Sequence, residues 1–146
     1  MENLTIKGLK TWATHDGGGY QFNLYEGKKK VLFVHNDGNG GCLDIQSLDD
    51  GDFLKRLNAY CEAQPPQVLQ YEGLPDMTIE MTPEIFLEDL VSDYEKAKQL
   101  AKAKKKGIVF RPTGESERSF QILNTLDLAV AKAYLDKEYP KGYQIL

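Results

Sequence analysis

Apolar residues in the first third of the chain fall in short runs separated by glycine-rich turns. The runs are Ile6–Ala13, Tyr20–Tyr25 and Val31–His35, and a fourth, shorter run covers Cys42–Gln46. Short runs rich in Val, Ile, Phe, Tyr and Leu, broken by Asp-Gly, Glu-Gly and Gly-Gly pairs, are typical of consecutive antiparallel strands. The pattern therefore predicts an N-terminal antiparallel β-meander.

Two departures from strict alternation add detail to this sheet. Gly8 lies inside the first run, between Ile6 and Leu9. A glycine at such a place predicts a β-bulge. The stretch Val31–Val34 is apolar at every position, which predicts a central strand whose outer face is covered by a helix.

Helical periodicity begins after the meander. Apolar residues recur at helical spacing across Asp50–Ala63, and two consecutive prolines follow. The sequence therefore predicts a helix that ends at those prolines. Residues Gln64–Met81 have the turn signals of a long connection, in which Val68–Tyr71 and Met77–Met81 each fit a short edge strand.

A long helix is the clearest element of the second half. Thr82 is the candidate N-cap and Pro83 fits the first helical position, and an apolar stripe continues from there to Lys105 or Lys106, before Gly107. Acidic residues fill the first half of this stretch and lysines fill the second, which matches the helix dipole at both ends. We therefore expect one uninterrupted helix.

The end of the chain has the pattern strand, turn, strand, helix, strand. The segments are Ile108–Arg111, Ser119–Leu123, Asp127–Glu138 and Tyr143–Leu146. Together with the meander and the long helix, they predict a single α+β domain over residues 1–146. The N-terminal meander packs against the long helix, and the C-terminal strand-helix-strand unit joins or flanks the sheet.

Composition and charge narrow the class of protein. Hydrophobic residues make up 41% of the 146-residue chain and charged residues 27%, which is typical of a globular protein. No apolar run approaches the roughly 18 residues that a membrane helix needs. The formal charge of −4 disfavours nucleic-acid binding by the whole surface, although a local basic patch stays open.

Cysteine usage points to a reducing compartment. Cys42 and Cys61 are the only two cysteines, they form no CxxC pair, and the N-terminus lacks the pattern of a secretory signal. We therefore expect two free thiols, no zinc site and a cytoplasmic location.

Two glycine-rich loops provide one candidate binding surface. In a four-stranded meander the first and third connections lie at the same edge of the sheet, about 10 Å apart. Imidazole and carboxylate groups there are suited to a ligand, a divalent metal or acid–base chemistry, and glycine-rich backbone can bind an anion. The alternative is that these residues only form turns. The candidate residues are His15, Asp16, Gly18, His35, Asn36, Asp37 and Asn39.

The lysine-rich end of the long helix provides a second candidate. Such a run is most often a solvated helix end. The alternative function is a patch for phosphate or for an acidic partner, although no aromatic residue alternates with the lysines to stack a base. The candidate residues are Lys102, Lys104, Lys105, Lys106 and Arg111.

Motifs for catalysis are missing from the sequence. It contains no GxSxG, HExxH, P-loop or GxGxxG between a strand and a helix. We therefore assign no catalytic residue, no metal ligand and no cofactor, and leave open whether the protein is an enzyme, favouring a non-enzymatic role.

Several segments toward the two ends of the chain carry a resemblance to known proteins, namely Ile6–Trp12, Asp16–Tyr25, Gly27–Val31, Asn36–Gly41, Lys105–Arg111 and Ala133–Tyr139. These segments resemble a group of small uncharacterised phage and prophage proteins. The resemblance leaves Ser47–Met81 unmatched and carries over no activity. It implies a phage-encoded protein that acts in the cytoplasm of the host cell.

Three functions follow as hypotheses. The leading one is a non-enzymatic phage accessory protein that binds and inhibits or modulates a host protein, such as a component of host defence. The second is a small-ligand protein that captures a nucleotide-like anion at the glycine loops or at the lysine-rich helix end. The third is a metal-assisted hydrolase that uses His15, Asp16, His35 and Asp37. The sequence leaves the oligomeric state open.

Overall fold

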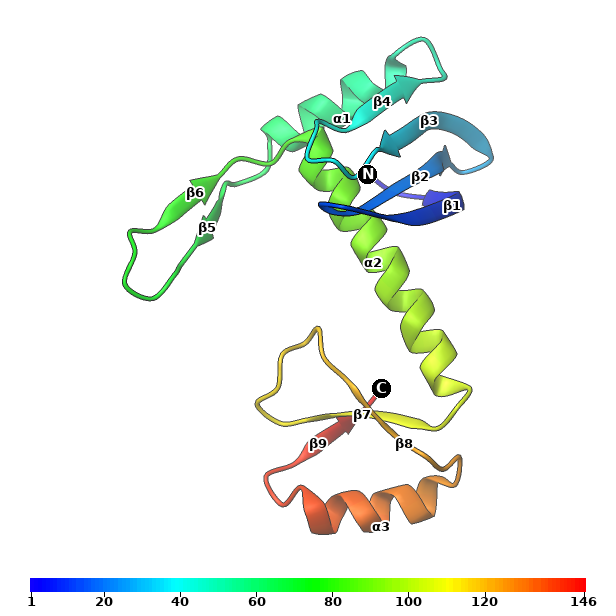
Figure 1. Cartoon of the computed structure of the whole chain (residues 1–146), viewed down its shortest axis with the longest axis vertical. Helices are drawn as coiled ribbons and strands as arrows, with labels where there is room; N and C mark the ends of the chain where they lie inside the picture. The colour runs from blue at the N-terminus through cyan, green and yellow to red at the C-terminus, as the bar shows by residue number, and fades with distance from the viewer. The chain divides into compact units, whose positions relative to one another are not determined.

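The N-terminal apolar runs form the predicted antiparallel meander (Figure 1). The computed structural model describes residues 1–146. Its first sheet has the strand order β1-β2-β3-β4, so each strand pairs with its neighbour in sequence. The strands are β1 Leu4–Thr14, β2 Gly17–Glu26, β3 Lys29–Asn36 and β4 Asp44–Ser47.

The bulge predicted at Gly8 is confirmed. The pairing between β1 and β2 shifts register between Lys7 and Lys10, and Gly8 has φ of +66°. This left-handed conformation is open to glycine at little cost and strained for most other residues. Ile6 is buried in the core and Leu9 packs against it, so the bulge keeps both residues on the core side of the sheet.

A second bulge explains the continuous apolar pattern of β3. Leu24 pairs with Leu32 but Tyr25 pairs with Lys30, so Val31 is an extra residue, and both Val31 and Leu32 are fully buried. Phe33 points to the other face and is not part of the core cluster. The prediction that a helix covers this outer face is therefore wrong, because the bulge places consecutive side chains in one core.

Helix α1 (Asp52–Glu62) begins two residues later than predicted. Asp50 and Gly51 both have positive φ, of 59° and 85°, and so cannot be part of the helix. The side-chain carboxylate of Asp49 accepts a hydrogen bond from the Phe53 N–H at 3.1 Å. The helix therefore starts after a tight turn that Asp49 stabilises.

The core of the meander is completed by two helices. Helix α1 and the first part of α2 (Pro83–Lys104) pack their apolar faces on the same side of the sheet. This confirms that the sheet packs against the long helix. The fully or almost fully buried members of this core include Phe22, Leu24, Leu32, Val34, Phe53, Leu57, Cys61, Leu87 and Val91.

Between these helices the chain forms a separate hairpin. Strands β5 (Gln67–Leu69) and β6 (Met77–Ile79) pair with each other in a two-stranded antiparallel sheet. The two short strands were predicted, whereas their exclusive pairing was not. Helix α2 then starts as expected, since the Thr82 hydroxyl accepts a hydrogen bond from the Ile85 N–H at 3.3 Å.

The C-terminal strands form a sheet of their own. Strand β7 (Ile108–Pro112) lies between β8 (Gln121–Leu123) and β9 (Tyr143–Ile145), all antiparallel. Helix α3 (Leu128–Glu138) connects β8 to β9 and is capped by the Asp127 side chain. The strand-helix-strand pattern is confirmed, and the alternative that these strands join the meander is wrong.

Residue contacts group the chain into two compact units, Met1–Val91 and Ser92–Leu146. The boundary falls inside α2, whose first part belongs to the core of the first unit. In the second unit, Ala131 and Leu135 of α3 are buried, as are Val109 and Phe110 of β7. Each unit therefore contains buried apolar residues of its own.

Candidate functional site

The two glycine-rich loops of the meander lie side by side, as the meander pattern predicted. The Trp12 indole N–H donates a hydrogen bond to the Asp37 carbonyl oxygen at 3.3 Å, and the Thr14 hydroxyl donates one to the Gly38 carbonyl oxygen at 2.6 Å. Gly38 is buried against Gly18 and Gly19. The end of β1 therefore holds the loop between β3 and β4 in place.

Side chains of the second loop mainly stabilise the loop itself. The Asn36 Oδ1 atom accepts a hydrogen bond from the Gly38 N–H at 2.8 Å, and the Asp37 Oδ1 atom accepts one from the Asn39 N–H at 2.9 Å. The His35 ring lies 5.4 Å from the Trp12 ring, centroid to centroid. Asn36 and Asp37 therefore have structural roles at the turn, whereas His35 is a residue of β3 that contacts Trp12.

The remaining predicted residues of the loops face solvent. His15, Asp16, Gly18 and Asn39 are exposed. Nowhere in the chain do three or more His, Cys, Asp or Glu side chains come together in an arrangement that could hold a metal ion. The adjacency of the loops is thus observed, and their use as a ligand surface stays a prediction.

Charge is divided unequally between the two units. Residues Met1–Val91 carry 15 acidic and 7 basic side chains, whereas Ser92–Leu146 carry 7 acidic and 11 basic ones, so the formal charges are −8 and +4. Between Arg56 and Lys96 the chain has no Lys, Arg or His at all. The two units therefore present fields of opposite sign to a partner.

The β5–β6 hairpin and its flanks, residues 64–82, form what we call the arm. In Figure 1 the arm extends as a thin ribbon beyond the strands and helices of its own unit. No residue from 64 to 80 belongs to the core cluster or packs against it. Four large apolar side chains of the arm are more than half exposed, namely Val68, Tyr71, Leu74 and Met77.

A hollow of about 260 Å³ lies at the base of the arm. Its lining includes two carboxylates, Glu62 and Glu80, together with Cys61 at the end of α1. Burial raises the pKa of the Cys61 thiol, which keeps it neutral and unreactive at neutral pH. The electrostatic character of this hollow is therefore set by the two glutamates.

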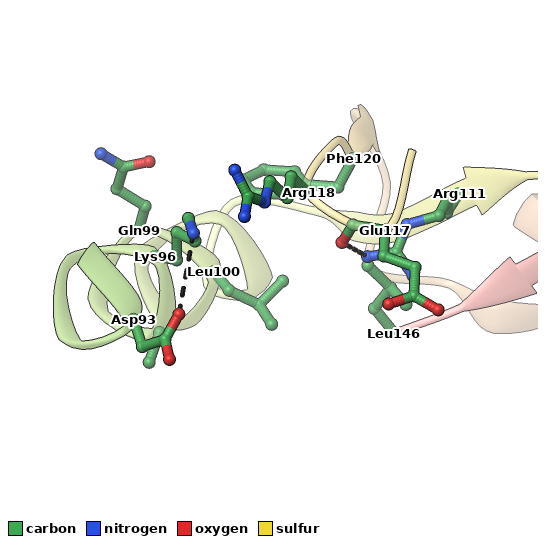
Figure 2. Close-up of a pocket in the computed structure, with 10 residues that line it drawn as sticks. Asp93, Lys96, Gln99, Leu100, Arg111, Glu117, Arg118, Phe120 and Leu146 are labelled. Carbon is green, nitrogen blue, oxygen red and sulfur yellow. Dashed lines mark hydrogen bonds and ion pairs between the residues drawn. The ribbon is translucent and has the colours of Figure 1, made fainter. Parts of the chain in front are cut away.

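In the second unit, a hollow of about 350 Å³ lies beside the second half of α2 (Figure 2). Lys96 lines it from the helix and pairs with Asp93 at 3.7 Å. Arg111 lines it from β7, and its guanidinium donates hydrogen bonds to the carbonyl oxygens of Ser119 and Glu117. Arg111 therefore fixes the loop that follows β7.

Arg118 is carried by this same loop. Its guanidinium reaches toward Lys96 and Gln99 of α2 in Figure 2. The guanidinium makes no hydrogen bond or ion pair, whereas the backbone N–H of Arg118 donates one to the Ser116 hydroxyl at 3.3 Å. The donors of the Arg118 guanidinium are therefore not used within the protein.

A second hollow of the second unit, of about 220 Å³, contains part of the predicted basic patch. Lys102 and Lys106 line it, together with Phe120 and Ile122. Of the five residues predicted for the patch, Lys102, Lys106 and Arg111 thus border one of the two hollows, whereas Lys104 and Lys105 border neither.

The chain matches no protein-family model, no curated protein and no solved structure. None of its helices combines the length and the apolar character that crossing a bilayer requires.

Sequence reasoning missed three parts of these surfaces. Lys96 and Arg118 were absent from the predicted patch, because their approach to Arg111 depends on how α2 packs beside β7 and its loop. The arm was predicted only as two strands. A signal for it was present, since the long stretch without a basic residue coincides with apolar residues that fit no helix face.

Proposed function

We propose that this protein is a non-enzymatic binding protein whose arm docks on a basic surface of a partner protein. In line with the resemblance to phage and prophage proteins, we propose that the partner is a host protein in the cytoplasm, such as a defence component, and that binding inhibits it. The observation that carries the proposal is the arm itself, an exposed apolar hairpin in a stretch without positive charge.

Exposure of the apolar side chains is the first supporting argument. An isolated two-stranded hairpin is marginally stable in water, and this one has no core to support it. Clusters of exposed apolar residues with a polar surround are characteristic of protein–protein contact sites. Burial of Tyr71, Leu74 and Met77 in a partner would remove apolar area from water and order the hairpin.

The negative charge of the arm favours a basic partner. The arm and its base carry four acidic residues, Glu62, Glu72, Asp76 and Glu80, and no basic residue. Complementary charge raises the association rate and disfavours acidic partners. The hollow between Glu62 and Glu80 would accept a Lys or Arg side chain of the partner.

The backbone of the arm offers a further contact. Strands β5 and β6 pair only with each other, so each has one unpaired edge. An unpaired edge can accept an additional strand from another protein. We therefore expect an extended, basic segment of the partner to lie along this hairpin.

The experiment compares two matched variants. Leu74 on the arm is 66% exposed and Leu126 in the second unit is 68% exposed, so Leu74→Ser and Leu126→Ser remove the same side chain at equal exposure. Tagged wild-type protein and both variants are used to capture partners from a lysate of a bacterial host. The captured protein is then purified, and its affinity for each variant is measured over a salt series.

The proposal requires a basic partner whose affinity falls about tenfold or more with Leu74→Ser, stays unchanged with Leu126→Ser, and decreases as salt increases. The partner's own activity should fall when wild-type protein is added in equal amount, and should not fall with Leu74→Ser. Equal binding of both variants, an acidic partner or undiminished partner activity would each contradict the proposal.

A further inference from the structure

The two hollows of the second unit adjoin along one side of α2. Both are lined by Gln99 and Phe120. The residues that line them from this side include Lys96, Gln99 and Lys102 of α2 and Lys106 in the turn just after the helix, at spacings of three, three and four. Such spacing places side chains on one face of a helix, so the hollows form one continuous groove with a basic helical wall.

Positive charge along this groove is mostly unpaired. Lys102, Lys106 and Arg118 have no ion-pair partner. The acidic residues that line the groove are Asp93 and Glu117, both at its first hollow, where Asp93 pairs with Lys96. The second hollow has no acidic residue in its lining. A negatively charged ligand would thus find several cations that no protein carboxylate neutralises.

The length of the groove selects an extended ligand over a single ion. Lys96 and Lys102 are six residues apart in α2, which corresponds to about 9 Å at 1.5 Å per residue, and Lys106 lies beyond the end of the helix at Lys104. One phosphate contacts only one end of such a row. A chain of phosphates at intervals of a few ångströms can contact all of it.

Phe120 adds a feature that a purely ionic groove lacks. It is partly exposed and lies where the two hollows meet, beside Ile122 at the second one. Proteins that bind single-stranded nucleic acid combine a basic groove with aromatic side chains, because each base can stack on a ring. The geometry points to a groove for single-stranded nucleic acid, with phosphates on Lys96, Lys102, Lys106 and Arg118 and a base on Phe120.

The test measures binding of a fluorescent single-stranded oligonucleotide to the full chain by anisotropy. Four phosphate contacts predict that log K falls against log salt with a slope of about −3, from about −0.7 for each contact. Lys102→Ala should weaken binding about fivefold at low salt and reduce the slope by about 0.7. Lys104→Ala is the matched control, since it removes the same charge from the same helix end outside the groove.

Two further measurements separate nucleic acid from other polyanions. Phe120→Leu should weaken oligonucleotide binding about fivefold or more through loss of stacking, and should leave binding of inorganic polyphosphate unchanged. Circular dichroism of each variant verifies folding. No oligonucleotide binding at low salt, equal losses for Lys102→Ala and Lys104→Ala, or no effect of a folded Phe120→Leu would each overturn the inference.

Discussion

Gly38 holds the two glycine-rich loops together, and its replacement by alanine tests that contact directly. Gly38 is buried and has φ of +81°. A Cβ atom added there would lie 2.6 Å from the Gly19 nitrogen and 2.7 Å from the Gly18 carbonyl carbon and from Thr14 Cγ2. Backbone atoms of a paired strand have little room to move, so we expect Gly38→Ala to separate the loops.

Two costs determine the size of the effect. A left-handed conformation is about 1–2 kcal/mol less favourable for an L-residue. Overpacking of a filled site costs a further 1–3 kcal/mol or so. The free energy of unfolding of the first unit should therefore decrease by about 2–5 kcal/mol. At a urea m-value of about 2 kcal/mol/M, the midpoint decreases by about 1–2.5 M.

The chain contains its own probe for this experiment. Trp12 is the only tryptophan, and its indole N–H binds the Asp37 carbonyl oxygen in the loop concerned. A urea titration followed by Trp12 fluorescence thus reports on the meander and its loops. Because the chain has two units, the helical circular dichroism signal averages over both and does not give this midpoint.

Gly40→Ala is the matched control. Gly40 has nearly the same φ, +79°, but an added Cβ atom has no neighbour within 4 Å. This variant should lose only the backbone contribution, about 1–2 kcal/mol. Equal midpoints for Gly38→Ala and Gly40→Ala would refute the reasoning, because contact between the loops would then contribute nothing to stability.

Three other predictions concern the rest of the chain. A Cβ atom at Gly107 would collide with a carbonyl oxygen of β8. Gly107→Ala should therefore destabilise the second unit by about 1–3 kcal/mol. Faster amide hydrogen exchange in β7 would show this loss, and unchanged exchange would contradict it. Cys42 is exposed, whereas Cys61 is buried and has a raised pKa. Ellman's reagent should therefore titrate one thiol in the native protein and two in urea. Rapid reaction of both thiols in the native protein would contradict this prediction. A hydrogen bond from Arg56 lowers the pKa of Glu26, so this stabilisation is present above pH 4.5 and disappears as pH falls through the lowered pKa. Glu26→Gln should therefore show a smaller loss of urea midpoint on acidification than the wild type, and an equal loss would count against the pairing.

Local signals in the sequence were sufficient for the elements themselves. Glycine pairs separate the strands of the meander, Gly8 marks its first bulge, and Thr82 and Asp127 lie at the starts of their helices. Each of these signals acts through the conformation or hydrogen bonding of a few neighbouring residues. For that reason they can be recognised without knowing the tertiary structure.

Features that depend on distant residues could not be obtained in this way. The bulge at Val31 is defined by the pairing of β2 with β3, which are separate segments of the chain. The choice of partner for β5, or for the C-terminal strands, depends on which edges are free once the other elements have packed. Hydrophobic periodicity shows which face of a strand is buried, but it does not show which other strand it pairs with.

Of the candidate sites, one could be predicted from the order of the strands, whereas the other depends on tertiary packing. Adjacency of the glycine loops followed from the connectivity of a meander, and the structure shows it. The same structure shows why residue type alone was a weak guide to their function, since Asn36 and Asp37 use their side-chain oxygens to form the loop. The basic groove, in contrast, is assembled from α2, β7 and the loop carrying Arg118.

The net charge of the chain conceals an uneven distribution. A formal charge of −4 argues against binding of polyanions only if the charge is spread evenly over the surface. Here it is the difference between a unit of −8 and a unit of +4. The lining of the groove of α2 contributes several lysines and Arg118, while the charged residues of the arm are all acidic. The two proposed surfaces can thus serve partners of opposite charge within a single chain.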